Sequence, residues 1–264
     1  MIPEPVAFLD SGVGGLPYLA FARSRLSGRR LVYVADRENF PYGEKPRSAI
    51  VAAALSLAER LIAREHPRLV VVACNTMSVV ALADLRARFP VPFVGVVPAV
   101  KPAASLSRRK RVGVLATRRT VEGEYLRNLI VEYAAGCDVV SLSSSALVEF
   151  VENELYRATP LQREERVRRE VERFLSEGID ALVLGCTHFL HLEPEFRSLL
   201  EAEGIALVDS RDGVARQAVR LLEGQPLEAA RGETDTLYVT GPLPLEERYQ
   251  WFAGQFGLKL QAGL

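Results

Sequence analysis

The sequence lacks the features that typify membrane proteins and nucleic-acid-binding proteins. Its 33 basic residues balance 33 acidic ones, so the formal net charge is zero and nothing in the composition indicates a polyanionic partner. No apolar run approaches the roughly 20 residues that are needed to span a bilayer. We therefore expect neither a nucleic acid nor a membrane as a partner.

Cysteine is also scarce, because the 264 residues include only Cys74, Cys137 and Cys186. Three cysteines cannot all pair and none lies in a C-x-x-C motif, which disfavours a disulfide framework and favours a reducing compartment. The chain enters a strand-like apolar run at once, without the basic segment of a signal peptide. These features predict a cytoplasmic protein. Cys137 precedes an apolar run and is expected to be a small buried hydrophobic residue.

Short apolar runs of strand length recur along the whole chain. They alternate with stretches in which apolar residues lie three and four positions apart, such as 48–64, 121–134 and 162–176. Strands that alternate with helices of this length are typical of βαβ units and of a mostly parallel sheet. The expected strands are Val6–Leu9, Leu31–Ala35, Leu69–Ala73, Pro92–Val97, Val112–Ala116, Asp138–Leu142, Ala181–Gly185, Ile205–Val208 and Leu237–Thr240.

The two halves of the chain show a weak internal repeat in the order and spacing of these runs. Each half has one strand between its first strand and its cysteine-bearing strand, and one further strand after the cysteine. We therefore predict an α/β fold of two similar doubly wound lobes, with mostly parallel sheets, that face a shared cleft. The first lobe is expected to comprise 1–97 plus 209–264, and the second 98–208.

Cys74 and Cys186 occupy matching places, each directly after a buried apolar run and before small polar residues. In open α/β sheets, ligands bind at the carboxyl ends of strands. A helix that begins at such a point favours the thiolate form of a cysteine at its N-terminus. The matched placement predicts one site with two reactive thiols.

Three uses of such a pair compete. A zinc site made of Cys74, Cys186 and His188 would lack a fourth ligand and the usual C-x₂₋₄-C spacing. A Cys–His nucleophile at Cys186 would leave the second cysteine without a role. Two opposed acid/base groups explain the duplication, because taking a proton from one face of a carbon and returning one to the other face inverts a stereocentre. No lysine stands beside a strand end to form a pyridoxal-phosphate Schiff base, so we expect no cofactor. Because the zinc ligand set is incomplete, we also expect no metal.

Two loops after the first strands are candidate ligand contacts. In Asp10-Ser11-Gly12-Val13-Gly14-Gly15, the glycines would let backbone N–H groups approach an anion. The spacing does not match G-x-G-x-x-G, so a strand-to-helix turn capped by Asp10 or Ser11 is an equal alternative to a ligand site. Pro41-Tyr42-Gly43 would offer a backbone N–H and a phenol to a ligand carboxylate, and the alternative is a turn with a packed tyrosine.

With these motifs taken together, the chain resembles the cofactor-independent glutamate racemases of the aspartate/glutamate racemase superfamily. The resemblance runs from position 8 to 188 in the family's order and spacing, and the remainder of the chain is compatible with it. The matching segments are Phe8–Leu16, Asp36 with Pro41-Tyr42-Gly43, Ala73–Thr76, Leu115–Thr117 with Thr120, and Leu184–His188.

The resemblance implies that two cysteines interconvert L- and D-glutamate, which would supply D-glutamate for bacterial peptidoglycan. In the family, the thiol that matches Cys74 handles the α-proton of D-glutamate and the thiol that matches Cys186 handles that of L-glutamate. Asp10 would assist Cys74, and His188 would assist Cys186. The expected substrate-binding residues are Asp10, Ser11, Tyr42, Gly43, Asn75, Thr76, Thr117, Thr120, Thr187 and His188.

The family also has a glutamate near its second cysteine, and the best match in this chain is Glu152. The sequence departs from the family here, because Asn153-Glu154 replaces a glycine that usually follows. Glu149 is close enough to leave the register between these two carboxylates open.

Two other functions remain as alternatives. The nearer is a racemase of aspartate or another amino acid in the same superfamily, although aspartate racemases usually carry Glu where His188 stands. The other is a two-lobed ligand-binding module without chemistry, against which the two intact cysteines argue. The expected partner is the small-molecule substrate glutamate, and a homodimer is a candidate assembly.

Overall fold

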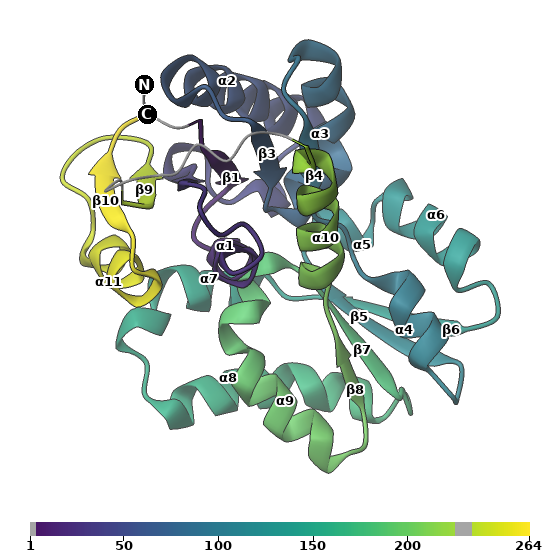
Figure 1. The fold of residues 1–264 in the computed structure, drawn as a ribbon. Helices are drawn as coiled ribbons and strands as arrows, with labels where there is room; N and C mark the ends of the chain where they lie inside the picture. Colours follow the sequence, from purple (N-terminus) through teal and green to yellow (C-terminus); the bar gives the residue numbers. More distant parts are fainter. Residues whose placement is uncertain (1–3, 225–233) are drawn as a thin grey trace. The chain divides into compact units, whose positions relative to one another are not determined.

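Strands and helices alternate along the chain in the computed structural model, which describes residues 4–224 and 234–264. They form two compact units, which we call unit 1 (Met1–Val96 with Arg211–Leu264) and unit 2 (Val97–Ser210). Each unit is built on one sheet in which the paired strands are parallel (Figure 1). The predicted α/β class with mostly parallel sheets is confirmed.

The sheet of unit 1 has six strands in the order β10-β9-β2-β1-β3-β4. Four come from the first part of the chain and two from its end: β1 (Val6–Asp10), β2 (Leu31–Ala35), β3 (Leu69–Val72), β4 (Phe93–Gly95), β9 (Thr236–Val239) and β10 (Lys259–Ala262). β1, β2 and β3 are buried along their whole length, as the unbroken apolar runs predict. β10 was not expected from the sequence, because Lys259–Ala262 is a partly exposed edge strand without an apolar run.

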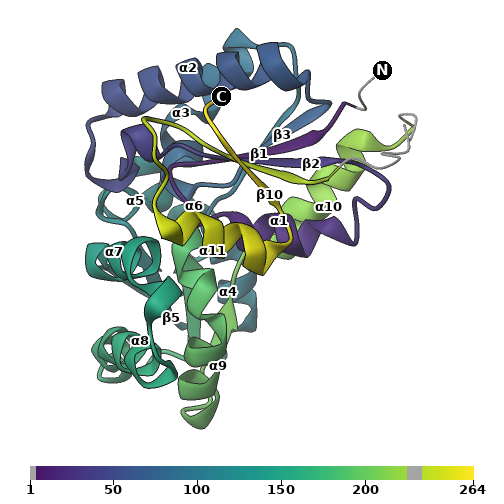
Figure 2. The same cartoon turned by 90° about the vertical axis from the view of Figure 1, so that its left-hand side faces the viewer.

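Helices cover both faces of this sheet. Figure 2 shows α2 (Arg47–Glu65) and α3 (Asn75–Arg88) on one face, and α1 (Leu16–Arg23), α10 (Arg211–Leu222) and α11 (Glu247–Phe256) on the other. The first face has a continuous core in which alternate strand residues meet the apolar stripe of α2, as Leu9 and Leu57 illustrate. Two short 3₁₀ helices, η1 (Arg37–Asn39) and η2 (Tyr42–Glu44), follow β2.

The sheet of unit 2 repeats the inner strand order of unit 1. Its order is β6-β5-β7-β8, which matches β2-β1-β3-β4 strand for strand. The strands are β5 (Arg111–Ala116), β6 (Asp138–Ser143), β7 (Ala181–Gly185) and β8 (Ala206–Val208). The internal repeat expected from the spacing of the apolar runs is therefore present in the topology of the two sheets.

Unit 2 also carries helices before and between its strands. They are α4 (Val100–Leu106), α5 (Arg118–Val121), α6 (Glu124–Tyr133), α7 (Ser145–Asn153), η3 (Leu155–Arg157), α8 (Pro160–Leu175), η4 (Thr187–Leu192) and α9 (Glu193–Ala202). The helical stretch expected over 121–134 is present as α6, but it begins later than expected, because the chain is extended at Gly123 (φ −75°, ψ 149°) between α5 and α6. Glycine is a poor residue for a helix interior, which makes it a natural point for this break.

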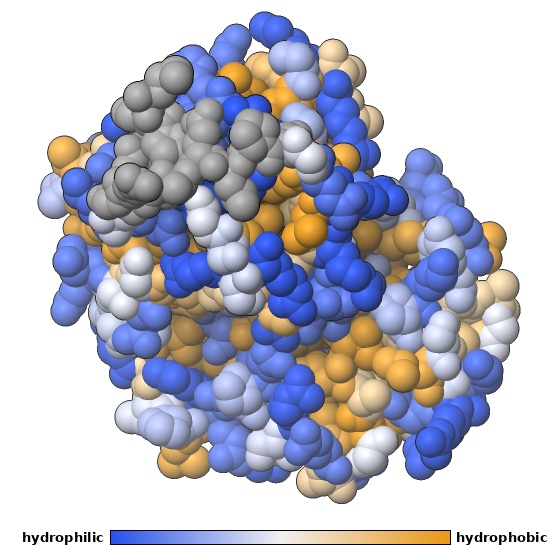
Figure 3. All heavy atoms as spheres, in the orientation of Figure 1, coloured by the Kyte–Doolittle hydropathy of each residue, from blue (hydrophilic) through white to orange (hydrophobic). Residues whose placement is uncertain are grey.

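Hydrophilic side chains are interspersed with smaller groups of hydrophobic ones on the surface in Figure 3. Within residues 4–224 and 234–264, none of the helices combines the length and the apolar character that crossing a membrane requires.

Candidate active site

The register of two neighbouring strands in unit 1 brings Ser11 beside Cys74. β1 and β3 pair in parallel with Leu9 opposite Val72, and the Ala73 N–H donates to the Leu9 carbonyl at 2.7 Å. Two residues further along each strand stand Ser11 and Cys74. The Cys74 Sγ and Ser11 Oγ atoms are 3.8 Å apart, a hydrogen-bonding distance for sulfur, and both residues are buried.

Asp10 organises the glycine-rich loop that follows β1. Its Oδ1 accepts hydrogen bonds from the Ser11 hydroxyl (3.0 Å) and from the Gly12 N–H (3.2 Å), and the residue is fully buried. The alternative in which Asp10 or Ser11 caps the following helix is not what the structure shows, because α1 begins after Gly15 without a side-chain cap. A Cβ at Gly15 would lie 2.5 Å from the Ala73 carbonyl oxygen, so glycine is what allows this loop to pack against the end of β3.

Tyr33 holds the same loop from β2, a role that the sequence analysis missed. Its hydroxyl donates to the Gly12 carbonyl at 3.0 Å and accepts from the Gly15 N–H at 2.9 Å. The available signal was a single hydroxyl-bearing residue in the otherwise aliphatic strand Leu31–Ala35, since a buried tyrosine needs a polar partner.

Cys74 is the N-cap residue of α3. Its Sγ accepts a hydrogen bond from the Met77 N–H at 3.5 Å, so the positive end of the helix faces the sulfur. The next residue, Asn75, is 2 % exposed, and neither its amide nitrogen nor its amide oxygen has a hydrogen-bond partner among the described residues. Thr76 is equally buried. A buried, unsatisfied amide beside a thiol at a strand end is a group that a ligand can satisfy.

Tyr42 is tied to a buried carboxylate. Its hydroxyl donates to Asp36 Oδ2 at 2.7 Å, and Thr240 donates to Asp36 Oδ1 at 2.8 Å. Burial, followed by the charge of Asp36, raises the pKa of Tyr42 far above that of a free tyrosine. The phenol proton is therefore committed to Asp36, and the expectation that Tyr42 and Gly43 bind a ligand carboxylate stays a prediction. Gly43 lies half-buried in η2.

The register of unit 2 places Thr117 beside Cys186 in the same way. β5 and β7 pair in parallel with Ala116 opposite Gly185, so the next residues on each strand are Thr117 and Cys186. The hydroxyls of Thr117 and Thr120 are 3.1 Å apart and hydrogen-bonded. Both threonines are buried, which places two hydroxyl groups at this strand end.

His188 links Cys186 to a carboxylate. The Cys186 Sγ lies 3.9 Å from His188 Nδ1, and His188 Nε2 lies 3.0 Å from Glu152 Oε2. The side chains of His188 and Glu152 are only 3 % and 1 % exposed. Glu152 thus holds the far nitrogen of the imidazole and leaves Nδ1 toward the thiol. Glu149, the other candidate for this position, is exposed and accepts instead from Asn153 at 2.7 Å.

Two further residues of unit 2 that the sequence singled out are Thr187 and Cys137. Thr187 follows Cys186 and is buried. Cys137 packs against the core between the sheet of unit 2 and helices α4 and α6, as expected of a small apolar residue, but it is half-buried and not fully buried as predicted. Among the residues that the structure describes, no group of three His, Cys, Asp or Glu side chains is arranged to hold a metal ion.

Each unit therefore carries a buried thiol at the end of its third strand. In unit 1 the sulfur contacts a helix N-terminus and a Ser–Asp pair. In unit 2 it contacts a His–Glu pair. Either arrangement can stabilise the thiolate form of the cysteine or accept the proton of its thiol form, as acid/base chemistry requires.

The family relationship follows from comparison with known proteins. A model of the Asp/Glu/hydantoin racemase family matches residues 19–218. This chain belongs to that family. It is 42 % identical to the glutamate racemase of Treponema pallidum (strain Nichols) over 255 residues, which cover 96 % of this chain and 94 % of the relative. It is 40 % identical to the glutamate racemase of Pectobacterium atrosepticum over 252 residues, covering 92 % and 88 %.

Solved structures of racemases resemble the whole chain. The Escherichia coli glutamate racemase, solved in complex with L-glutamate, superposes with a TM-score of 0.89 at 35 % identity and covers 99 % of this chain and 98 % of its own. The glutamate racemase of Aquifex pyrophilus gives a TM-score of 0.73 at 30 % identity, with 98 % of both chains covered. The doubly wound pair of α/β units is thus the fold of this racemase family.

Proposed function

We propose that this protein is a glutamate racemase in which Cys74 and Cys186 act as two bases on opposite faces of one α-carbon. The observation that carries the proposal is the matched register of the two thiols. Cys74 lies level with Ser11, the first residue after β1, and Cys186 lies level with Thr117, the first residue after β5. The substrate is inferred from relatives that carry the name glutamate racemase at 40–42 % identity over most of this chain.

Racemisation then proceeds by two proton transfers. One thiolate removes the α-proton, so that the C–H bond breaks, an S–H bond forms and the electron pair stays on the substrate as a carbanion. The other thiol protonates the opposite face, which inverts the centre and leaves that sulfur as the thiolate. The reverse reaction exchanges the two roles. This scheme requires both strand ends to face a single cleft, as the sequence analysis predicts.

The Cys74 side contributes hydrogen-bond donors that can hold the substrate. The side-chain amide of Asn75 is buried without a partner, and the N-terminal turn of α3 presents N–H groups at the same place. N–H groups at a helix N-terminus favour a bound carboxylate or a developing carbanion. We assign Asn75, Thr76 and Ser11 to substrate binding on this side, with Asp10 orienting Ser11.

The Cys186 side contributes a proton route. With the imidazole proton on Nε2, His188 donates to Glu152, and Nδ1 can accept the proton of Cys186. The Glu152 carboxylate stabilises the imidazolium that results. We assign Thr187, Thr117 and Thr120 to substrate binding on this side, because all three are buried beside the same strand end.

Turnover of enantiopure amino acids tests the proposal. Polarimetry with L-glutamate and, separately, D-glutamate should show decay of rotation to zero, and the same assay with L-aspartate should show little change. Faster turnover of aspartate would assign the chain to another substrate of the family. Tight glutamate binding without loss of rotation would assign it to the ligand-binding alternative.

Several finer expectations accompany this function and remain predictions. They are the supply of D-glutamate for peptidoglycan, location in the cytoplasm, independence of cofactors and assembly as a homodimer. The division into lobes at 97/98 and 208/209 is likewise an expectation from the sequence.

A further inference from the structure

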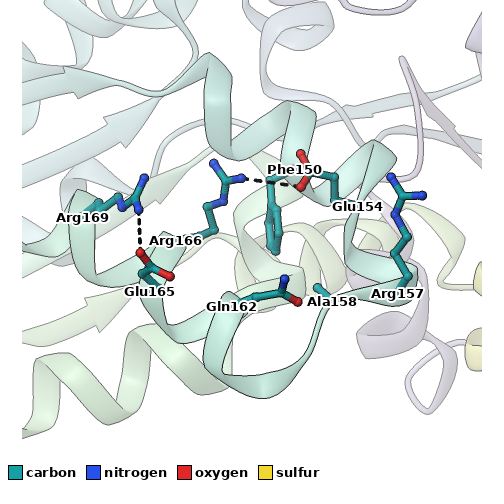
Figure 4. Close-up of a pocket in the computed structure, with 8 residues that line it drawn as sticks. All are labelled: Phe150, Glu154, Arg157, Ala158, Gln162, Glu165, Arg166 and Arg169. Carbon is teal, nitrogen blue, oxygen red and sulfur yellow. Dashed lines mark hydrogen bonds and ion pairs between the residues drawn. The ribbon is translucent and has the colours of Figure 1, made fainter.

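A pocket on unit 2 is lined by none of the residues assigned above to catalysis or substrate binding. It has a volume of about 320 Å³ and is formed by the end of α7, by η3 and by the start of α8. In the view of Figure 4, Phe150 lies between Arg166 and Arg157, with Gln162 and Ala158 below them. The lining residues are Phe150, Glu154, Arg157, Ala158, Gln162, Glu165, Arg166 and Arg169.

Arg157 supplies a positive charge to this pocket that no carboxylate neutralises. Its guanidinium lies 5.5 Å from the centre of the Tyr156 ring, and within the described part of the chain it forms no ion pair. The residue is exposed, so its five N–H donors are available to a ligand.

The other two arginines are held by weak partners. Arg166 reaches Glu154 at 3.5 Å and stacks over Phe150 at 5.1 Å, while Arg169 pairs with Glu165 at 2.6 Å. The four charged side chains are 38–64 % exposed. Exposed pairs of this kind contribute about 0–1 kcal/mol, so a more highly charged ligand can displace the carboxylates at little cost.

The N-terminus of α8 adds donors to the same pocket. Gln162 Oε1 accepts from the Thr159 N–H at 2.9 Å in a capping box, which leaves the Gln162 amide N–H groups for another acceptor. The first turn of this 16-residue helix thus lies against the pocket, and its positive end favours an anion there.

We propose that this pocket binds a small organic phosphate. Glu154 pairs with Arg166 and Glu165 pairs with Arg169, so each carboxylate binds one arginine. A phosphate monoester carries about two charges and three terminal oxygens, so several guanidinium groups can bind it at once. The phosphoryl group would lie between Arg157, Arg166 and the Gln162 amide. A volume of about 320 Å³ corresponds to roughly ten water molecules, which leaves room for the organic part of the ligand.

Titration of the full chain with glycerol 1-phosphate, at constant ionic strength, tests the proposal by amide NMR. We expect saturable shifts at the Ala158 backbone N–H and the Gln162 side-chain amide. Arg157→Gln should raise the dissociation constant about tenfold, the effect of one charge-assisted hydrogen bond. Arg127→Gln is the matched control, because Arg127 is an exposed arginine of α6 in the same unit and the change in net charge is the same.

Three results would overturn the proposal. The first is the absence of saturable shifts at Ala158 and Gln162. The second is equal weakening by Arg157→Gln and Arg127→Gln, which would indicate attraction by overall charge alone. The third is binding of malonate as tight as that of glycerol 1-phosphate, which would identify a carboxylate site. Inorganic phosphate should bind the same residues more weakly, because it lacks the organic part.

Discussion

Cys74 and Cys186 follow equivalent strands at equivalent register positions, yet their surroundings differ. Cys74 caps an α-helix of 14 residues and accepts a hydrogen bond from the Met77 N–H. Cys186 precedes a 3₁₀ turn, its side chain accepts no capping hydrogen bond, and an imidazole lies beside the sulfur instead. One thiol is thus stabilised by fixed backbone dipoles and the other by a group that itself accepts a proton.

The difference continues one strand further out in each sheet. Asp36 follows β2 in unit 1, and Ser144 follows β6 in unit 2, each with its N–H bonded to the carbonyl of the neighbouring strand end. Asp36 binds Tyr42 and Thr240, whereas Ser144 caps α7 and donates to Glu170 at 2.6 Å. Because α7 carries Glu152, the second unit uses this position to hold the helix that places a carboxylate beside His188. The repeated strand order sets the positions of the two thiols, and the segments after the neighbouring strands determine which side chains lie near them.

Removal of either thiol should have the largest effect. Cys74→Ser and Cys186→Ser should each lower racemisation of glutamate by about 10²–10⁴-fold in both directions, because both proton transfers are needed for inversion. Deuterium uptake from solvent separates the two variants. Cys74→Ser should still exchange the α-proton of L-glutamate through Cys186, and Cys186→Ser that of D-glutamate.

The third cysteine is the control for these variants. Cys137→Ser removes a half-buried thiol that packs against the core of unit 2 and should leave racemisation unchanged. Near-normal inversion by Cys74→Ser or Cys186→Ser would reject the two-thiol mechanism.

Loss of the Glu152 charge should affect proton transfer by Cys186 more than proton transfer by Cys74. Glu152→Gln removes the carboxylate that stabilises a protonated His188, and we expect kcat to fall about 10²-fold. The equilibrium constant of a racemase ties the two values of kcat/KM together, so the asymmetry must be measured by isotope exchange. Deuterium uptake into L-glutamate should fall more than uptake into D-glutamate.

Glu149→Gln is the matched control on the same helix. Glu149 is exposed and bonded to Asn153, so the variant should exchange both enantiomers at the rate of the unmodified protein. An equal decline of both exchange rates in Glu152→Gln would show that this carboxylate does not belong to one thiol.

Asn75 and Ser78 distinguish a ligand-binding group from a structural one on helix α3. Asn75→Ala should lower kcat/KM by about tenfold or more without loss of stability, because the amide has no partner in the described structure. Ser78→Ala should lower the stability of the fold and leave kcat/KM nearly unchanged. Its hydroxyl donates to the Val72 carbonyl at 3.0 Å and accepts from the Val96 N–H at 2.9 Å, so its loss should cost about 1–3 kcal/mol in unfolding free energy.

Steady-state kinetics with glutamate and thermal unfolding of both variants measure these effects. A marked loss of stability in Asn75→Ala with normal kinetics would remove Asn75 from the substrate site.

The sequence predicted most of the fold because buried parallel strands are unbroken apolar runs, and their order revealed the repeat. The edge strand β10 has no such run, and the break at Gly123 lies within a helical pattern of apolar residues. The periodicity of apolar residues therefore reveals neither the edge strand nor the break in the helix.

The position of the two cysteines was predictable, because each directly follows an apolar run and the structure places both, buried, at the ends of strands. The choice between Glu149 and Glu152 was not, because residues three apart lie near each other on a helix and only the packing of α7 decides which is buried. The hydrogen bond between the Tyr42 phenol and Asp36 also depends on tertiary contacts. Thr240, which directly follows β9 and is distant in sequence, donates a second hydrogen bond to the same carboxylate.

Tyr42 should give unit 1 a dependence on alkaline pH that has no counterpart at Ser144. Burial, and then the charge of Asp36, raises the pKa of Tyr42 in the folded state, whereas an unfolded tyrosine has a pKa near 10. The stability contributed by this proton is fully present below pH 10. It declines as the pH rises further, by up to about 1.4 kcal/mol per pH unit, because only the unfolded state releases the proton.

Tyr42→Phe should therefore show two effects in denaturant unfolding. Near pH 7 it should cost about 1–3 kcal/mol, since Asp36 loses one hydrogen-bond donor. Above pH 10 its deficit relative to the unmodified protein should shrink, because phenylalanine has no proton to lose. Thr240→Val removes another donor from the same carboxylate without a titrating group, so its deficit should not change with the ionisation of tyrosine. Parallel pH profiles for the two variants would contradict the assignment of the Tyr42 proton to Asp36.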